Sequence, residues 1–506
     1  MCLFLAALMV GGVAYSIIVS LARNVSAASN NTYIRVGLQY GSSATSTVTL
    51  SSSTGFELGT LDSGYNFTPF KTITDTSVRL SCASGDVSMS TSIAIQKTNK
   101  TLIYGNPKGA VYIRPVNESK GNYITFGSNK YAGIIQVTRQ GNKLVIVNLL
   151  EMEQYIMGVL PYEVYTTWPA ETLKAFSIVV RSYTKGSLGR HSSDGFDLCA
   201  TSHCQVYKGR NLVTLSVESA VKATKGLVIK YKGKIVPSYY SDSTGGVTAS
   251  AHDTWGSNSS YDYLKAIATP WEKYADRSRG AWETVYTPKE LYSQLHSKGY
   301  FNASTGSVSS VKITKFCTNS SYVYSAQVTS AAGETVTISR ADKIRSAFGL
   351  YSANFVVGKG GSTVTRTDYV LGSVSKKTPY TVQTQNSKVT VEAQSSMTVA
   401  TSSGNKSISA PSELTVLTAY GKFGVPTSTV TSAEPTLNNL VSGSKIAKTV
   451  NVKLGGSSSN FVFSGRGWGH GVGFSQWGMK DLADLGANYK QIISAYLSDV
   501  TVESIY

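Results

Sequence analysis

The residues best suited to chemistry lie in a short stretch from Tyr155 to Glu163, which reads YIMGVLPYE. Glu163 falls in a turn between two apolar segments that are expected to be helical. Apolar and aromatic surroundings desolvate a carboxyl group and raise its pKa, which suits a general acid that works near neutral pH. The structural alternative is that Glu163 caps a helix or forms an ion pair with Arg181.

A second stretch, from Asp197 to Tyr207, reads DLCATSHCQVY, and His191 precedes it. Thiolate and imidazole groups are ligands that zinc prefers. The spacing is not that of a standard zinc finger, and we expect the adjacent His203 and Cys204 to have difficulty sharing one tetrahedral site. A disulfide between Cys199 and Cys204, simple packing, and a Cys–His nucleophile pair remain as alternatives.

Two further stretches combine glycine with polar and aromatic side chains. Ser238 to Thr248 reads SYYSDSTGGVT, and its hydroxyl groups and rings suit a sugar ligand. Gly465 to Gly478 reads GRGWGHGVGFSQWG, which we interpret as a rigid loop that presents polar side chains to a cleft. A dinucleotide site is not expected, because the βαβ context and the downstream acid are missing. Ordinary turns, or glycines that let two backbones pack closely, are the structural alternatives.

The elements that must position these residues are mostly strands. Residues 30–118 and 357–459 contain short segments of alternating apolar and polar residues, separated by turn residues, and predict antiparallel β modules. Between them, apolar periodicity predicts a helix over 151–160 and a second, largely buried helix that opens at Trp168 and Pro169. A last helix is predicted over 489–497. The predicted fold class is therefore α+β, mostly β, with a helical centre.

The chain has 506 residues, enough for roughly three domains, and a net charge of +18. A hydrophobic fraction of 41% excludes a disordered protein, and scattered lysines argue against a nucleic-acid partner. Residues 2–22 form an uncharged apolar run, so we expect 1–28 to be a signal peptide or a retained membrane anchor of an exported protein. The cysteines beyond Cys2 are too few for a disulfide framework.

Taken in order, these stretches resemble the SpoIID/LytB domain family, which includes stage II sporulation protein D and the amidase enhancers. The resemblance rests on Tyr-x-x-Gly-Val-x-Pro-x-Glu, Trp-Pro-x-Glu-x-Leu-Lys-Ala, Arg-x-Tyr, His-Cys-Gln-Val-Tyr and the glycine-rich signature. It covers residues 120–356 and 460–506, with 357–459 as an insertion. The chain departs from the usual pattern at Val164, Ser182 and Thr244, and 251–253 replaces a commonly acidic run, which puts substrate contacts there in doubt.

The resemblance implies a SpoIID-type catalytic domain and a lytic transglycosylase that cleaves peptidoglycan glycan strands lacking stem peptides. Glu163 matches the catalytic residue of the family. Arg181 is expected to hold a sugar substituent or to tune Glu163. The cleft candidates for substrate binding are Arg181, Gln205, Tyr207, Tyr240, Ser243, Gly245, Gly246, Thr248, His470, Ser475 and Gln476. Cys199 and His203 are candidate ligands of a structural zinc, and no cofactor is expected to be required for catalysis.

The expected partners are glycan strands and a cell-wall amidase, with membrane contact only through the N-terminal segment and no nucleic acid. The expected location is the outer face of the cytoplasmic membrane or the cell wall of a bacterium. The alternative function is a non-catalytic wall-binding protein that enhances an N-acetylmuramoyl-L-alanine amidase.

Overall fold

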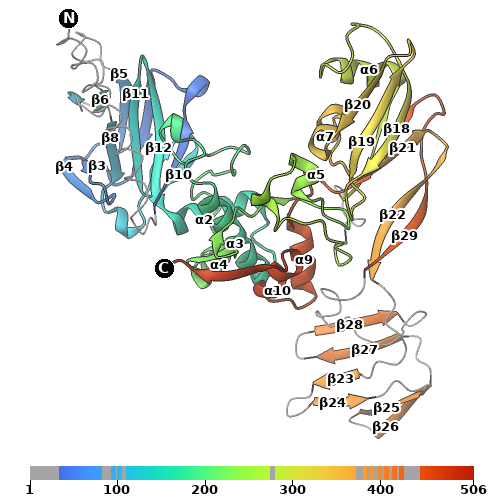
Figure 1. The fold of residues 1–506 in the computed structure, drawn as a ribbon. Helices are drawn as coiled ribbons and strands as arrows, with labels where there is room; N and C mark the ends of the chain where they lie inside the picture. The colour runs from blue at the N-terminus through green and yellow to red at the C-terminus, as the bar shows by residue number, and fades with distance from the viewer. Residues whose placement is uncertain are drawn as a thin grey trace, which may run out of the picture.

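The computed structural model describes residues 33–82, 93–97, 100–104, 110–273, 280–371 and 445–506, with the short segments 380–383, 388–391, 396–401, 404–409, 413–418 and 421–426. The predicted signal peptide or anchor, 1–28, lies outside these residues. Two β-rich arms rise from a helical base (Figure 1). The α+β, mostly β fold class is confirmed. Within the described ranges, no helix is long and apolar enough to cross a membrane.

The N-terminal arm consists of two sheets, ordered β13-β1-β12-β11-β8-β3-β4 and β10-β9-β2-β5-β6-β7. Strand β12 lies between β1 and β11 and also contacts the second sheet and the helical base, so its residues from Leu144 to Leu150 are all buried. The larger sheet continues past the domain boundary predicted at 118–120, because β11 and β12 belong to it. The strands are β1 (Tyr33–Gln39), β2 (Thr47–Ser51), β3 (Phe56–Leu61), β4 (Phe67–Ile73), β5 (Ser77–Cys82), β6 (Ile93–Lys97), β7 (Lys100–Tyr104), β8 (Ala110–Pro115), β9 (Ile124–Phe126), β10 (Asn129–Tyr131), β11 (Ile134–Gln140), β12 (Lys143–Glu151) and β13 (Leu198–Cys199).

The helical base is built around α3, which contacts every other helix named in this paragraph. The predicted helices in the middle and at the end of the chain are confirmed, and α3 is buried on most sides as expected. Pro161 stands in the last turn of α2, which ends at Glu163. The helices are α2 (Met152–Glu163), α3 (Ala170–Gly186), α4 (Leu215–Ala223), α9 (Gln476–Asp484) and α10 (Tyr489–Tyr496).

The C-terminal segment returns to the middle of the chain through two strand pairs. Strand β31 (Phe474–Ser475) lies parallel to β16 (Tyr240–Ser241), and β32 (Val500–Ser504) lies antiparallel to β14 (Leu227–Tyr231). Residues 235–240 do not form one continuous strand: only the ends of this stretch, in β15 (Lys234–Ile235) and β16, are paired. Pro237 stands between them and lacks the N–H that a ladder requires.

The second arm contains two three-stranded sheets, ordered β17-β30-β21 and β18-β19-β20. The predicted insertion, 357–459, includes a ribbon of β22 and β29 and three hairpins. Elements of this arm and of the insertion are α5 (Ala251–Trp255), β17 (Ala281–Tyr286), α6 (Pro288–His296), β18 (Val308–Phe316), β19 (Val323–Ser330), β20 (Thr335–Ser339), α7 (Ala341–Phe348), β21 (Phe355–Lys359), β22 (Thr363–Leu371), β23 (Tyr380–Gln383), β24 (Lys388–Val391), β25 (Ser396–Thr401), β26 (Gly404–Ser409), β27 (Glu413–Thr418), β28 (Gly421–Pro426), β29 (Lys445–Lys453) and β30 (Phe461–Arg466).

An ion pair between Arg181 and Glu153 joins α2 to α3. The guanidinium is completely buried and donates to both carboxylate oxygens, at 3.0 and 2.6 Å. It also donates to the backbone oxygen of Leu227 at 3.0 Å, while the N–H of Gly226 donates to Glu153 at 3.2 Å. Removing one member of such a pair leaves an uncompensated charge in the interior.

We therefore expect Arg181→Met to lower the free energy of unfolding by about 3–5 kcal/mol. Urea unfolding followed by circular dichroism measures this loss. Lys174→Met is the control, because it breaks the more exposed pair with Glu171 and is expected to cost at most about 1 kcal/mol. Equal small losses in both variants would contradict a structural role for the Arg181–Glu153 pair.

Candidate functional site

Three chain segments meet at the side chain of Glu163, the last residue of α2. The backbone N–H of Val206 donates to one carboxylate oxygen at 3.3 Å. The amide of Gln476, at the start of α9, donates to the backbone oxygen of Glu163 at 2.8 Å and lies 3.4 Å from the other carboxylate oxygen. The hydroxyl of Tyr240, in β16, also forms a hydrogen bond with the carboxylate. The carboxylate is thus held by a backbone amide, a side-chain amide and a phenol.

Burial raises the pKa of Glu163 to about 7, although the hydrogen bonds from Val206, Tyr240 and Gln476 act in the opposite direction. A carboxyl group of this kind is present in both protonation states near neutral pH. It can therefore give a proton to a leaving group and take one back in a later step. The raised pKa expected from the apolar and aromatic surroundings of Glu163 is what the structure shows, and its cause is desolvation.

Gln205 supports this arrangement without contacting Glu163 directly. Its side-chain oxygen accepts from the hydroxyls of Thr184 at 2.9 Å and Tyr155 at 3.4 Å. Its amide nitrogen donates to the hydroxyl of Tyr240 at 3.2 Å. Because the Tyr240 oxygen receives this hydrogen bond, its own hydrogen is available to the Glu163 carboxylate. Gln205 is 1% exposed, so it positions Tyr240 rather than contacting a substrate.

The structure does not bring Arg181 to Glu163. Its guanidinium pairs with Glu153, and a side chain with no exposed surface has none to offer a sugar. Neither the ion pair with Glu163 nor the expected substrate contact is present. Glu171, the next acid along the chain, pairs with Lys174 on α3.

Several predicted substrate contacts are also replaced by internal hydrogen bonds. The hydroxyl of Tyr207 donates to the side chain of Asn148 at 2.7 Å, and Ser475 caps α9 by accepting from Gly478 at 3.0 Å. The hydroxyl of Thr248 accepts from the backbone of Ile267 at 2.8 Å. The predicted residues that are buried with their side chains so engaged are Gln205, Tyr207, Ser243, Thr248, Ser475 and Gln476. Tyr240 and His470 keep part of their surface.

The two glycine loops, predicted as separate features, lie against each other. Ser243 and Trp468 exchange backbone hydrogen bonds of 3.3 and 2.8 Å. A Cβ on Gly245 would stand 2.6 Å from the Cβ of Arg466, and one on Gly467 would stand 2.7 Å from the Ser243 oxygen. At these two positions glycine permits two backbones to pack closely, which was the structural alternative for the loop from Gly465 to Gly478. The ring of His470, in the second loop, lies against those of Tyr239 and Trp255, and burial lowers its pKa to about 4.

Sequence reasoning missed Glu272, a carboxylate that is only 4% exposed. It accepts from the Ser243 hydroxyl at 2.5 Å, from the backbone N–H of Thr244 at 3.1 Å and from the Thr244 hydroxyl. Burial raises its pKa, and these donors, with the hydroxyl of Ser475, oppose the rise. Glu272 therefore joins the first glycine loop to the strand that leads to Gln476. The signal available in the sequence was an acid directly after Pro270 and Trp271.

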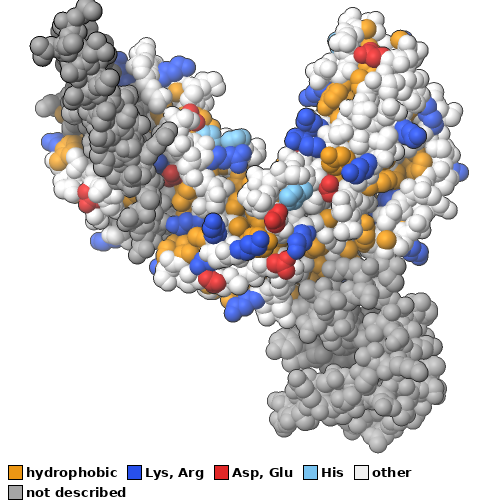
Figure 2. Space-filling view, in the orientation of Figure 1, with side chains coloured by type: hydrophobic (Ala, Val, Ile, Leu, Met, Phe, Trp, Pro, Cys, Tyr) orange, Lys and Arg blue, Asp and Glu red, His pale blue; other side chains and the backbone are white. Residues whose placement is uncertain are grey.

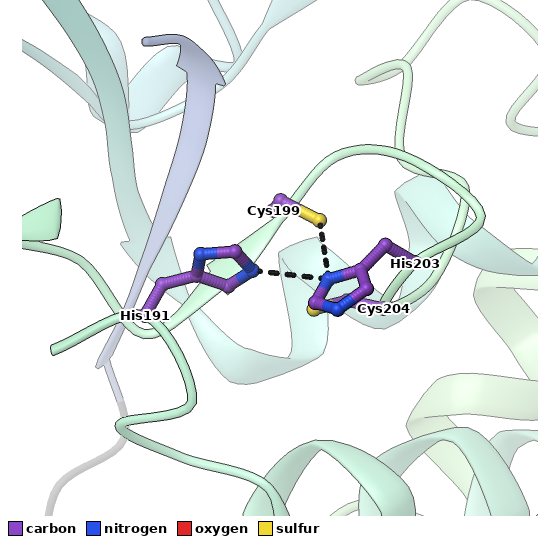
Figure 3. A group of neighbouring side chains, drawn as sticks. All are labelled: His191, Cys199, His203 and Cys204. Atoms are coloured by element: carbon purple, nitrogen blue, oxygen red, sulfur yellow. Dashed lines mark hydrogen bonds between the residues drawn. The ribbon is translucent and has the colours of Figure 1, made fainter. Parts of the chain in front are cut away.

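A second cluster contains His191, Cys199, His203 and Cys204, whose candidate ligand atoms lie within 4.8 Å of one another (Figure 3). The Nδ1 atom of His203 is 3.7 Å from each sulfur and 3.2 Å from Nε2 of His191. Tetrahedral zinc with two sulfur and two nitrogen ligands places these atoms about 3.3–3.8 Å apart, and the three separations from Nδ1 of His203 agree with this range to about 0.1 Å. The donor set and its spacing therefore suit zinc. The described cysteines, 199 and 204 among them, are free thiols.

The cluster corrects one expectation and extends another. His203 and Cys204, although adjacent, bring Nδ1 and Sγ within 3.7 Å of each other in the cluster (Figure 3). The predicted pair of Cys199 and His203 gains His191 and Cys204. The other ring nitrogen of His191 lies 2.8 Å from the carboxylate of Asp194, a partner that fixes the orientation of ligating histidines.

These features define a class: an α+β protein with one desolvated carboxyl at a helix end beside a cluster of two cysteines and two histidines. Residues 140–231 match the model of the family described as SpoIID, Stage II sporulation protein. That range contains Glu163 and the whole Cys/His cluster and ends before Tyr240 and Gln476. Over these residues the chain is similar to the SpoIID/LytB family.

Three curated relatives are similar to parts of the chain. An uncharacterised protein of Brachyspira hyodysenteriae is 30% identical over 31% of this chain and 45% of its own length. The amidase enhancer of Bacillus subtilis is 26% identical over 79% of this chain and 47% of its own length. Stage II sporulation protein D of the same organism is 26% identical over 46% of this chain and 67% of its length. The chain thus spans about half the length of the first two relatives.

The raised pKa of Glu163 predicts a pH-dependent stability. The pKa of glutamate in an unfolded chain is about 4.3. Between this pH and about pH 7, Glu163 is protonated in the folded protein and ionised in the unfolded chain. Stability therefore falls as pH rises through this window, by about 4 kcal/mol in total. Glu163→Gln has no such charge to bury, and its stability relative to wild type should increase from pH 4.5 to pH 8. Denaturant unfolding at both pH values tests this; an unchanged difference would contradict it, and Glu171→Gln is the control.

The cluster predicts a metal stoichiometry. Purified protein should carry one zinc ion per chain, measured by inductively coupled plasma mass spectrometry. Cys204→Ser should retain less than about a tenth of the wild-type zinc content, since each structural ligand contributes strongly to zinc affinity. Cys82→Ser, which changes a thiol in β5 outside the cluster, should keep the full complement. Zinc content that is equal in both variants would exclude the cluster as the metal site.

Proposed function

We propose that this chain is an exported lytic transglycosylase that cleaves the bond between MurNAc and GlcNAc in peptide-free peptidoglycan strands. The observation that supports this most directly is the Glu163 carboxyl, with a pKa of about 7 and only neutral donors around it. Similarity to the family adds a link to sporulation and the cell wall, since the relatives are named amidase enhancer and stage II sporulation protein D.

In the proposed reaction Glu163 serves first as acid and then as base. Its carboxyl proton passes to the glycosidic oxygen as the bond to C1 of MurNAc breaks, which releases the GlcNAc hydroxyl. The carboxylate then takes the proton of the MurNAc C6 hydroxyl, whose oxygen bonds to C1 and closes the 1,6-anhydro ring. Because no water attacks, a second carboxylate is not needed. The donors from Val206, Tyr240 and Gln476 stabilise the carboxylate between the two steps.

The proposed zinc has a structural role in this scheme. His191, Cys199, His203 and Cys204 would hold it, and the bound ion would crosslink the loop that follows α3 to β13 and to the segment after it. Cys204 is directly followed by Gln205 and Val206, the residues that act on Tyr240 and Glu163. No step of the reaction requires the metal, so no cofactor is proposed for the chemistry itself.

The proposed location is the outer face of the cytoplasmic membrane or the cell wall of a bacterium, reached through residues 1–28. The proposed partner is glycan freed of stem peptides by a cell-wall amidase. The net charge of +18 favours an anionic polymer, and Figure 2 shows Lys and Arg side chains on both sides of the hollow between the two arms.

A second candidate function is a non-catalytic enhancer of an amidase. It is supported by the similarity to the amidase enhancer of Bacillus subtilis over 79% of this chain. The two functions differ in what Glu163 must do, because enhancement by binding needs no proton transfer.

Digestion of denuded glycan strands, with mass analysis of the chain ends, tests the proposal. Wild type should release 1,6-anhydro ends, and Glu163→Gln should lower the rate at least about a hundredfold, the usual contribution of a general acid. Glu171→Gln, which removes an acid of α3, should keep the wild-type rate.

If wild type releases no anhydro ends but stimulates an amidase, and Glu163→Gln stimulates it equally, the enhancer function holds. Equal release of anhydro ends by wild type and Glu163→Gln would exclude Glu163 as the catalytic residue.

A further inference from the structure

Arg190 is an exposed cation beside the Cys/His cluster, in the loop that follows α3. Its guanidinium donates to the hydroxyl of Tyr183 at 3.2 Å and lies 3.4 Å from Nε2 of His203. In the described part of the chain no carboxylate forms an ion pair with it. A phenol and an imidazole are both neutral, so they do not compensate the charge of the guanidinium, and most of its N–H donors have no acceptor among them.

Zinc binding by the Cys/His cluster would remove the hydrogen bond between Arg190 and His203. The cluster geometry assigns Nδ1 of His203 to the metal, so Nε2 carries the hydrogen. Guanidinium groups only donate, and two donors cannot form a hydrogen bond. In the zinc-loaded protein the second amino group of Arg190 therefore has no acceptor on His203 and is available to an anion.

A ring contact and one peptide unit lead from Arg190 toward Glu163. The ring of Tyr183 packs against Tyr239 at 5.7 Å, and the next residue, Tyr240, binds the carboxylate of Glu163. Tyr239 also contacts the half-buried ring of Trp255 at 4.7 Å. The ring of Tyr183 is buried, whereas Tyr239 and Trp255 keep part of their surface. A cation near such half-buried rings suits a sugar that bears an acidic substituent, because the rings meet the apolar face of the sugar and the cation meets the acid.

We propose that Arg190 binds the free lactyl carboxylate of a muramic acid unit and thereby selects strands that have lost their stem peptides. This inference rests on the proposed function. A stem peptide converts the lactyl carboxylate into a neutral amide, which offers no charge-assisted pair to a guanidinium. Arg190 is a specificity residue in this scheme, since it takes no part in the proton transfers of Glu163.

A binding experiment without cleavage tests the proposal. The reference protein is zinc-loaded Glu163→Gln, and the two probes are denuded glycan and the same glycan with its carboxylates converted to amides. The reference should bind the acidic glycan at least about tenfold more tightly, the usual contribution of a hydrogen bond to a charged group. Adding Arg190→Gln should remove this preference by weakening binding to the acidic glycan alone.

Adding Lys222→Gln is the matched control, because it removes the same charge from an exposed side chain of α4 and should leave the preference intact. Arg190→Lys keeps the positive charge but loses the two parallel N–H donors of the guanidinium, so it should retain part of the preference for the acidic glycan. Zinc content and thermal unfolding confirm that each variant is folded.

The proposal is overturned if the reference binds both glycans equally, or if Arg190→Gln keeps the full preference. An equal loss in the Lys222 variant would also overturn it, since general electrostatics would then explain the effect. A failure of the transglycosylase proposal is detected in a separate experiment, because wild-type digests would then contain no anhydro ends.

Discussion

The burial of one carboxyl group organises the centre of this molecule. Glu163, at the end of α2, is removed from water, so its ionisation costs free energy. Hydrogen-bond donors from the loop after β13, from β16 and from α9 offset only part of this cost. Each donor belongs to a different part of the chain, so its position depends on a different set of contacts. The buried carboxylate of Glu272 and the packed glycine loops can be understood as the support for these donors.

The loop from His203 to Val206 serves two sites at once. Its first two residues point to the Cys/His cluster, and its next two act on Tyr240 and Glu163. Any force that moves the cluster is therefore transmitted over one or two peptide units to the carboxyl group. A metal crosslink at the Cys/His cluster, as proposed, would therefore also restrain the donors of Glu163.

Much of this was accessible from the sequence, because local patterns determine it. The helices of the base, the desolvated Glu163 and the concentration of cysteine and histidine all follow from neighbouring residues. The hydrogen-bond and ion-pair partners of the polar side chains could not be predicted from neighbouring residues. Glu153 and Glu163 lie on different sides of the same helix, and only the packing of α3 decides that Arg181 meets the former. Likewise, the hydroxyl of Ser243 faces inward because Glu272 approaches it from a distant segment.

The contact between Gln476 and Glu163 joins residues 313 positions apart. A ribosome makes the chain from its N-terminus, so α2 and its carboxyl group exist long before α9 has been synthesised. Until then Glu163 lacks one of its donors, and the strand pair of β16 and β31 cannot form. The order of synthesis alone therefore keeps Glu163 without its Gln476 donor until residue 476 has been made, and a nascent chain that ends earlier carries the acid without that donor.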